Sequence, residues 1–132
     1  MNYLIDTHVL IWALSSPGKI SRKVQKILLN PESEIYVSIL SFWEISLKYS
    51  LNKLEFKGLN PNELPVWAEK SGFHTLNLTA EDASSFHKLP KSSYKDPFDR
   101  MLVWQSIQNK LTLLSQDKSL KAYQDSGLKS LW

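Results

Sequence analysis

Acidic side chains in this sequence fall at positions from which several carboxylates could act together on one metal ion. They are Asp6, Glu44, Asp96, Asp99 and Asp117. Asp6 ends an apolar run at residues 2–5, which is typical of a buried strand in a parallel sheet. Open α/β folds bind their ligands at the carboxyl edge of such a sheet. We therefore expect the acids to return to this edge.

A shared acidic site would need a cation. Carboxylates within several ångströms of one another raise each other's pKa, so some would be protonated near neutral pH. A divalent ion removes this conflict, and all-oxygen ligands suit Mg²⁺ or Mn²⁺. The chain has no cysteine and only 3 histidines, which gives little support to zinc. Such a metal activates water and neutralises charge on a phosphate, as phosphodiester hydrolysis requires.

Helix capping is a simpler explanation for some of these acids. Asp96 precedes Pro97 and has Asp99 three residues further on, so an N-cap and the helix macrodipole would account for both. Asp117 would likewise cap the helix that follows it. Each of these acids, taken alone, is better explained as a cap than as a ligand.

Glu44 and Asp6 are harder to explain by local structure. Glu44 interrupts an apolar stripe at helical spacing within residues 40–51. Its local partner would be Lys48, and an exposed pair of this kind contributes only about 0.3–0.5 kcal/mol. We therefore expect Glu44 to point inward for another reason. A buried strand that ends at Asp6 likewise gains nothing from the charge unless the charge has a partner.

Alternating strands and helices supply the framework for these residues. Strands are predicted at residues 2–6, 35–38, 74–78, 111–115 and 128–131. Helices are predicted at residues 9–14, 21–29, 41–51, 60–71, from 79 onward, 96–109 and 117–123. This alternation predicts right-handed βαβ units, with a parallel sheet of four to five strands and helices on both of its faces.

Length and composition favour one ordinary globular domain over residues 1–132. Of the 132 residues, 42% are hydrophobic and 22% charged. The absence of cysteine excludes disulfides, and the longest apolar run, residues 9–14, is too short to cross a membrane. We expect a cytoplasmic protein with no membrane contact. The formal net charge of +3 is compatible with a polyanionic partner.

Four stretches in this order carry a family resemblance. They are LIDTHVLIW at residues 4–12, SFWEISLK at 41–48, DPFDRML at 96–102 and LLSQD at 113–117. Together they resemble the PIN-domain family and, more narrowly, the VapC-type toxins of bacterial type II toxin–antitoxin systems. The resemblance implies a three-layer α/β/α sandwich, and an endoribonuclease that depends on Mg²⁺ or Mn²⁺.

The resemblance also assigns roles to residues. It places the family's catalytic, metal-binding acids at Asp6, Glu44, Asp99 and Asp117, with Asp6 and Asp99 as the direct ligands. Residues that would support the acids or contact substrate are Asp96, Ser115, Thr7, Arg100 and Lys48. For Arg100, a structural ion pair with Asp96 or Asp99 is an equally good interpretation.

Histidine and tryptophan are expected to be structural. We predict that His8 is packed and orients its loop, rather than acting as an acid–base group or ligand. Four tryptophans lie in apolar patterns and are predicted to belong to the core rather than to stack on bases: Trp12, Trp43, Trp67 and Trp104.

The resemblance implies partners as well. These are an RNA substrate, a cognate antitoxin that covers the acidic pocket, and a second copy of the chain in a homodimer. Exposed apolar residues within 21–29 or 41–51 would form an interface. The alternative is a catalytically inactive PIN-like module that acts through protein or RNA contacts, although the intact acids count against it. The sequence contains no glycine-rich phosphate loop and no Gly-x-Ser-x-Gly elbow.

Overall fold

A single parallel sheet runs through the protein. The computed structural model describes residues 1–54, 60–93 and 96–132. The strands are β1 (Asn2–Ile5), β2 (Glu34–Ser38), β3 (His74–Leu76), β4 (Thr112–Leu114) and β5 (Lys129–Leu131). Their order in the sheet is β3-β2-β1-β4-β5, and all pairs are parallel. The parallel sheet of four to five strands predicted from the sequence is thereby confirmed, with five strands.

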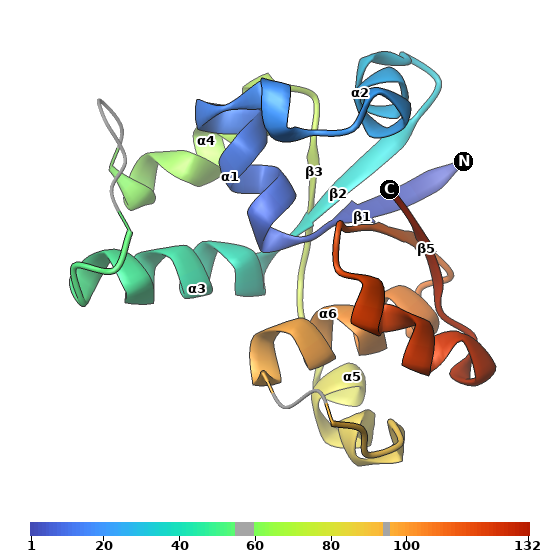
Figure 1. The fold of residues 1–132 in the computed structure, drawn as a ribbon. Helices are drawn as coiled ribbons and strands as arrows, with labels where there is room; N and C mark the ends of the chain where they lie inside the picture. The colour runs from blue at the N-terminus through green and yellow to red at the C-terminus, as the bar shows by residue number, and fades with distance from the viewer. Residues whose placement is uncertain (55–59, 94–95) are drawn as a thin grey trace.

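The helices between the strands lie on both faces of the sheet (Figure 1). They are α1 (Thr7–Ser15), α2 (Arg22–Leu29), α3 (Ile39–Ser50), α4 (Leu64–Lys70), α5 (Ala80–Ser85) and α6 (Pro97–Gln108). Short 3₁₀ helices are η1 (Pro17–Lys19), η2 (Pro61–Glu63) and η3 (Phe86–Lys88), and a longer one is η4 (Lys118–Ser126). The helix expected at residues 117–123 is therefore a 3₁₀ helix, and that expected at 60–71 is divided into η2 and α4.

The alternation of side chains along β1 produces two cores. Tyr3 and Ile5 point to one face, where they pack with buried residues of α1, α2, α3 and α4. Leu4 points to the other face, which is covered by α6 and η4. Leu4 also pairs with Tyr36 of β2 and Leu113 of β4, so β1 occupies the middle of the sheet. Both faces are buried, and the three-layer α/β/α architecture follows.

Side-chain caps determine where the helices at the carboxyl edge begin. Asp6 Oδ1 accepts the backbone N–H of Val9 at the start of α1. Asp96 Oδ1 accepts the N–H groups of Phe98 and Asp99 at the start of α6. Asp117 caps η4 in the same way. The capping predicted for Asp96 and Asp117 is confirmed, and these helix starts lie at the edge where β1 and β4 end. None of the helices in the described ranges is long and apolar enough to span a bilayer.

Candidate active site

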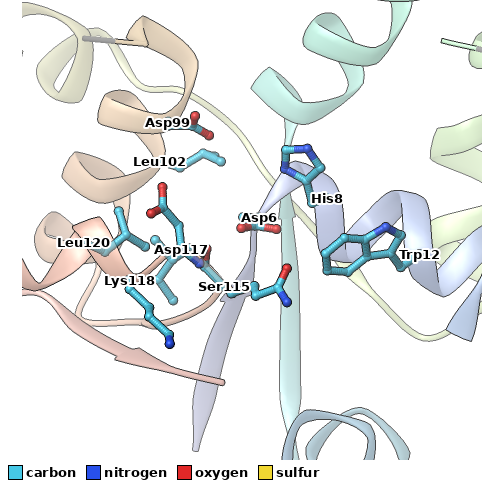
Figure 2. A pocket seen from close by; sticks show the side chains of 11 residues that line it. Asp6, His8, Trp12, Asp99, Leu102, Ser115, Asp117, Lys118 and Leu120 are labelled. Carbon is cyan, nitrogen blue, oxygen red and sulfur yellow. Dashed lines mark hydrogen bonds between the residues drawn. The ribbon is translucent and has the colours of Figure 1, made fainter. Parts of the chain in front are cut away.

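A pocket of about 530 Å³ opens where β1 and β4 end (Figure 2). Its lining includes three of the predicted acids, Asp6, Asp99 and Asp117. They come from the start of α1, the first turn of α6 and the start of η4, three segments far apart in the sequence. The pocket is also lined by His8, Trp12, Leu102, Leu113, Ser115, Gln116, Lys118 and Leu120.

Asp6 is the most deeply placed acid of the pocket. It is 9% exposed, and burial raises the pKa of its carboxyl group above the ordinary value of 3.8. The nearby charge of Asp117 raises this pKa further, whereas hydrogen bonds with Ser115 and the Val9 backbone lower it. A carboxylate of this kind is costly to ionise and gains from a cation beside it.

Ser115 and Asp117 form a local turn after β4. The Ser115 hydroxyl accepts the N–H of Asp117 at 3.1 Å. Asp117 Oδ1 in turn accepts from the N–H of Ser119 at 2.9 Å and from its hydroxyl at 2.6 Å. These bonds fix Asp117 at the rim of the pocket. Ser115 therefore contacts both Asp6 and Asp117, which is a supporting position of the kind predicted for it.

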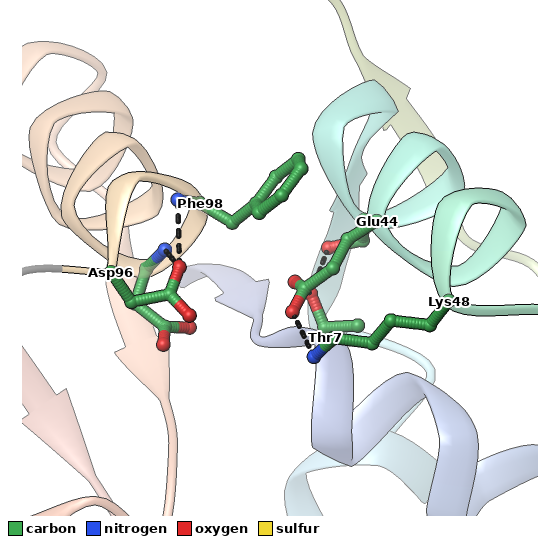
Figure 3. Close-up of polar contacts among 7 residues, drawn as sticks. Thr7, Glu44, Lys48, Asp96 and Phe98 are labelled. Atoms are coloured by element: carbon green, nitrogen blue, oxygen red, sulfur yellow. Dashed lines mark hydrogen bonds and ion pairs between the residues drawn. The ribbon is translucent and has the colours of Figure 1, made fainter. Parts of the chain in front are cut away.

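Glu44 does not line the pocket, although it is only 2% exposed. Thr7 Oγ1 donates to its Oε1 at 2.8 Å, and Lys48 Nζ pairs with its Oε2 at 2.6 Å (Figure 3). The sequence correctly predicts that this carboxylate points inward. From the sequence, the contact with Lys48 is underestimated, because this ion pair is expected to be exposed. The lysine side chain reaches a buried oxygen of Glu44, and Thr7 donates a second hydrogen bond to the same carboxylate. The two contacts hold Glu44 on the α3 side of the site.

The acids fit a hard divalent cation with few protein ligands. Within residues 1–54, 60–93 and 96–132, no group of three or more histidine or acidic side chains is close enough to enclose a metal. Mg²⁺ does not require such a group, because it is usually bound by one or two carboxylates and keeps several waters. Asp6 beside Asp99 and Asp117, in a pocket large enough for water, provides that donor set. The ligand roles of Asp6, Glu44, Asp99 and Asp117 stay predictions.

Arg100 points away from the acids that precede it. Its Nε donates to the Tyr123 hydroxyl, and its Nη2 donates to the carbonyls of Leu89 and Pro90. Its guanidinium also lies 4.9 Å from the centre of the Phe86 ring. The polar contacts that the structure describes for Arg100 thus do not include an ion pair with Asp96 or Asp99. The residue joins α6 to the segment that contains η3.

The prediction that His8 is packed is wrong. His8 is exposed at the mouth of the pocket, and its ring lies 5.8 Å from that of Trp12. The sequence contains a signal for this contact, because His8 and Trp12 are four residues apart and share one face of a helix. Neither residue was predicted to belong to the site.

Among the tryptophans, Trp43 is the clear exception to the predicted core location. Trp104 is buried and Trp12 and Trp67 are half-buried, but Trp43 is 60% exposed. Its ring meets that of Phe98 on α6 at 5.2 Å, edge to face. The two rings come from residues adjacent to Glu44 and Asp99, so they lie beside the acidic site.

Known proteins match almost the whole chain. Ribonuclease VapC22 of Mycobacterium tuberculosis is 23% identical over 133 residues, which cover 98% of this chain and 97% of the relative. Among solved structures, VapBC2 from Rickettsia felis, bound to a promoter DNA fragment, has a TM-score of 0.74 at 18% identity and covers 99% of this chain and 98% of that one. FitAcB from Neisseria gonorrhoeae has a TM-score of 0.67 at 19% identity, with 100% and 97% covered.

The family model agrees with these likenesses. The model of the PIN domain matches residues 3–125, from the first strand to the end of the helix that Asp117 caps. The match therefore includes every segment that contributes an acid to the pocket. This protein belongs to the PIN-domain family.

Proposed function

We propose that this protein is a metal-dependent endoribonuclease and the toxin of a toxin–antitoxin pair. The observation that carries the proposal is the set of three carboxylates, Asp6, Asp99 and Asp117, in one pocket of a PIN-domain chain. A relative with the name ribonuclease and neighbours solved as toxin–antitoxin complexes support it. The proposed cofactor is Mg²⁺ or Mn²⁺, since both ions prefer oxygen ligands.

The three pocket acids, and Glu44 outside the pocket lining, would have different roles in phosphodiester hydrolysis. Asp6 and Asp99 would bind the metal. The Asp6 side chain is held by a backbone N–H in the first turn of α1, and the backbone N–H of Asp99 is capped by the N-cap side chain of α6, so both acids are limited in how far they move. The ion supplies an activated water and neutralises charge on the phosphate. Asp117 and Glu44 would orient water and accept a proton. Lys118, exposed at the pocket, would contact an RNA phosphate.

RNA cleavage by substituted proteins tests this function. In the presence of Mn²⁺ or Mg²⁺, we expect Asp6→Asn and Asp99→Asn to cut RNA at least about 100-fold more slowly, because each loses a charged ligand of the metal that neutralises the phosphate. Asp125→Asn, an exposed acid outside the pocket lining, is the matched control and should retain activity. If the two pocket variants cleave as fast as the parent, the catalytic proposal is wrong.

One observation favours the alternative of an inactive binding module. Asp6, Asp96 and Asp117 each have a structural use as a helix cap, which does not require a metal. Thermal unfolding distinguishes the two functions. A metal site in the pocket predicts that Mn²⁺ raises the unfolding temperature and that Asp6→Asn abolishes the rise, whereas caps alone predict no effect of the metal.

The proposals for a homodimer and for an antitoxin partner rest on an exposed apolar stripe and on the negative charge of the pocket. An apolar stripe on α3 and its C-cap residue consists of Trp43, Leu47 and Leu51, which recur every four residues and are 60%, 39% and 53% exposed. We propose that this stripe packs against a second copy of the chain in a homodimer. For the antitoxin, the acids that line the pocket suit a basic side chain inserted from the partner.

A further inference from the structure

The buried carboxylate of Glu44 already has a cation beside it. Lys48 lies one turn further along α3, with its Nζ 2.6 Å from Glu44 Oε2. The lysine side chain keeps 40% of its surface exposed, whereas that of Glu44 keeps 3%. The ammonium group therefore reaches the carboxylate from the solvent side and closes it off.

Thr7 fixes the second oxygen of the same carboxylate. Its Oγ1 lies 2.8 Å from Glu44 Oε1 and 3.0 Å from the Ser41 hydroxyl. A hydroxyl has only one proton, and an ionised acceptor attracts it more strongly than a neutral one. Thr7 thus gives its proton to Glu44, and the proton of Ser41 serves the second contact. Both oxygens of Glu44 have partners without a metal.

Lys48 also lies within the field of the acids on α6. Asp96 and Asp99 act on its ammonium group electrostatically, in addition to the direct contact with Glu44. Figure 3 shows Lys48 on the side of α3 that faces Asp96. The ammonium is therefore a positive charge inside the acidic site, contributed by the chain itself.

We propose that Lys48 is a built-in counter-ion of the acidic site, which neutralises Glu44 before metal binds and opposes metal binding by its positive charge. The inference rests on the proposed metal dependence. Its physical basis is that a buried carboxylate without a cation is costly, while two cations in one acidic site repel each other. Lys48 stabilises the metal-free fold and, by the same charge, weakens metal binding.

Calorimetric titration of the full chain with Mn²⁺ at pH 8 tests the inference. Lys48→Met keeps most of the aliphatic chain and removes the charge. We expect it to bind Mn²⁺ about five-fold more tightly, the effect of one unit charge several ångströms from a divalent ion in a partly exposed site. Its unfolding temperature without Mn²⁺ should fall, and the rise on adding Mn²⁺ should exceed that of the wild type.

Charge-matched variants identify the cause. Lys48→Arg keeps a cation near Glu44 and should bind Mn²⁺ as the wild type does. Lys26→Met removes an exposed charge from α2 and should not alter Mn²⁺ affinity. Glu44→Gln/Lys48→Met removes both charges of the pair, so no buried charge is left unpaired and the net charge of the pair stays as in the wild type. Its affinity for Mn²⁺ should therefore lack the gain expected for Lys48→Met alone.

The results separate this inference from the proposed function. If the wild type binds Mn²⁺ and Asp6→Asn weakens that binding, but Lys48→Met binds no more tightly, the counter-ion role alone is wrong. The same holds if Lys26→Met gains as much affinity as Lys48→Met. If the wild type does not bind Mn²⁺ at all, both the counter-ion role and the metal dependence are wrong.

Discussion

Asp6 and Asp117 use the same side chain for two purposes. The Oδ1 of each accepts a hydrogen bond from a backbone N–H at the start of a helix, and each residue lines the pocket. From the sequence, capping and metal binding were competing explanations for Asp117, whereas the cap at Asp6 was not predicted. A carboxylate has two oxygens, so a cap at one of them positions the other. The local cap is the reason the acid points consistently toward the pocket.

The buried charge of Asp6 predicts a specific dependence of stability on pH. Because burial raises its pKa, the folded state binds this proton more tightly than the unfolded state does. The resulting stability is fully present below the ordinary pKa of 3.8 and is lost as the pH rises through the raised value. In metal-free solution at pH 8, Asp6→Asn should therefore unfold at a higher urea concentration than the wild type.

The same comparison at pH 4 provides the control. There a larger fraction of the wild-type carboxyl is protonated than at pH 8, so the difference between the two proteins should shrink. The Asn side chain keeps an oxygen for the Val9 N–H, so the cap is retained in both. An Asp6→Asn protein that is less stable than the wild type at pH 8 without metal would contradict the prediction.

Thr7 tests how firmly Glu44 is held. Thr7→Val removes the hydroxyl that donates to Glu44 while keeping the side-chain shape. We expect the free energy of unfolding to fall by about 1–2 kcal/mol, since a buried acceptor loses its donor. Thr75→Val makes the same chemical change at an exposed position of β3 and should alter stability by less than about 0.5 kcal/mol. Equal effects in urea denaturation would show that the Glu44 bond contributes nothing.

Helix starts in this chain are predictable from the sequence, whereas helix faces are less so. The Asp96–Pro97 pair predicts the start of α6 within one residue, because cap and proline signals are local. For α3 the sequence contains more apolar residues than one face can bury. Packing turns Ile45 inward and leaves Trp43 outside, and only the neighbouring helices decide this.

Arg100 holds three parts of the fold together. It links α6 to the Leu89 and Pro90 carbonyls and to Tyr123 of η4. Arg100→Lys should lower the free energy of unfolding by about 1–3 kcal/mol, since an ammonium cannot reproduce the fork of bonds. Arg22→Lys, exposed on α2, is the control and should change little.

Hydrogen exchange and RNA binding complete the test of Arg100. Backbone amides at residues 86–89 should exchange faster in Arg100→Lys, and the RNA affinity of the folded protein should be unchanged. Weaker RNA binding at unchanged stability would instead make Arg100 a substrate contact.

At the scale of the molecule, the sequence predicts the architecture but not the full convergence of the acids. Alternating apolar strands and amphipathic helices indicate a parallel sheet, and the location of ligand sites at its carboxyl edge follows from topology. Three acids do meet there. The separate position of Glu44 depends on Lys48 and Thr7. The helical spacing predicts the pair with Lys48, but the bond from Thr7, 37 residues away in the sequence, leaves no pattern in one sequence.

The apolar stripe on α3 predicts the oligomeric state. If Trp43, Leu47 and Leu51 meet a second copy, sedimentation should show a dimer for the wild type and a monomer for Leu47→Glu/Leu51→Glu. Val66→Glu adds a charge at an equally exposed apolar residue on α4 and should leave the dimer intact. A wild type that sediments as a monomer at the highest attainable concentration would contradict the proposal.

The central place of β1 has a consequence for the order in which the protein is made. β1 is synthesised well before its partner β4, because the register joins Tyr3 to Thr112, more than 100 residues later in the sequence. A nascent polypeptide that has not yet reached Asp117 lacks one wall of its acidic pocket. The site proposed for RNA cleavage would therefore be complete only once nearly the whole domain has been synthesised, and truncated translation products should lack the activity.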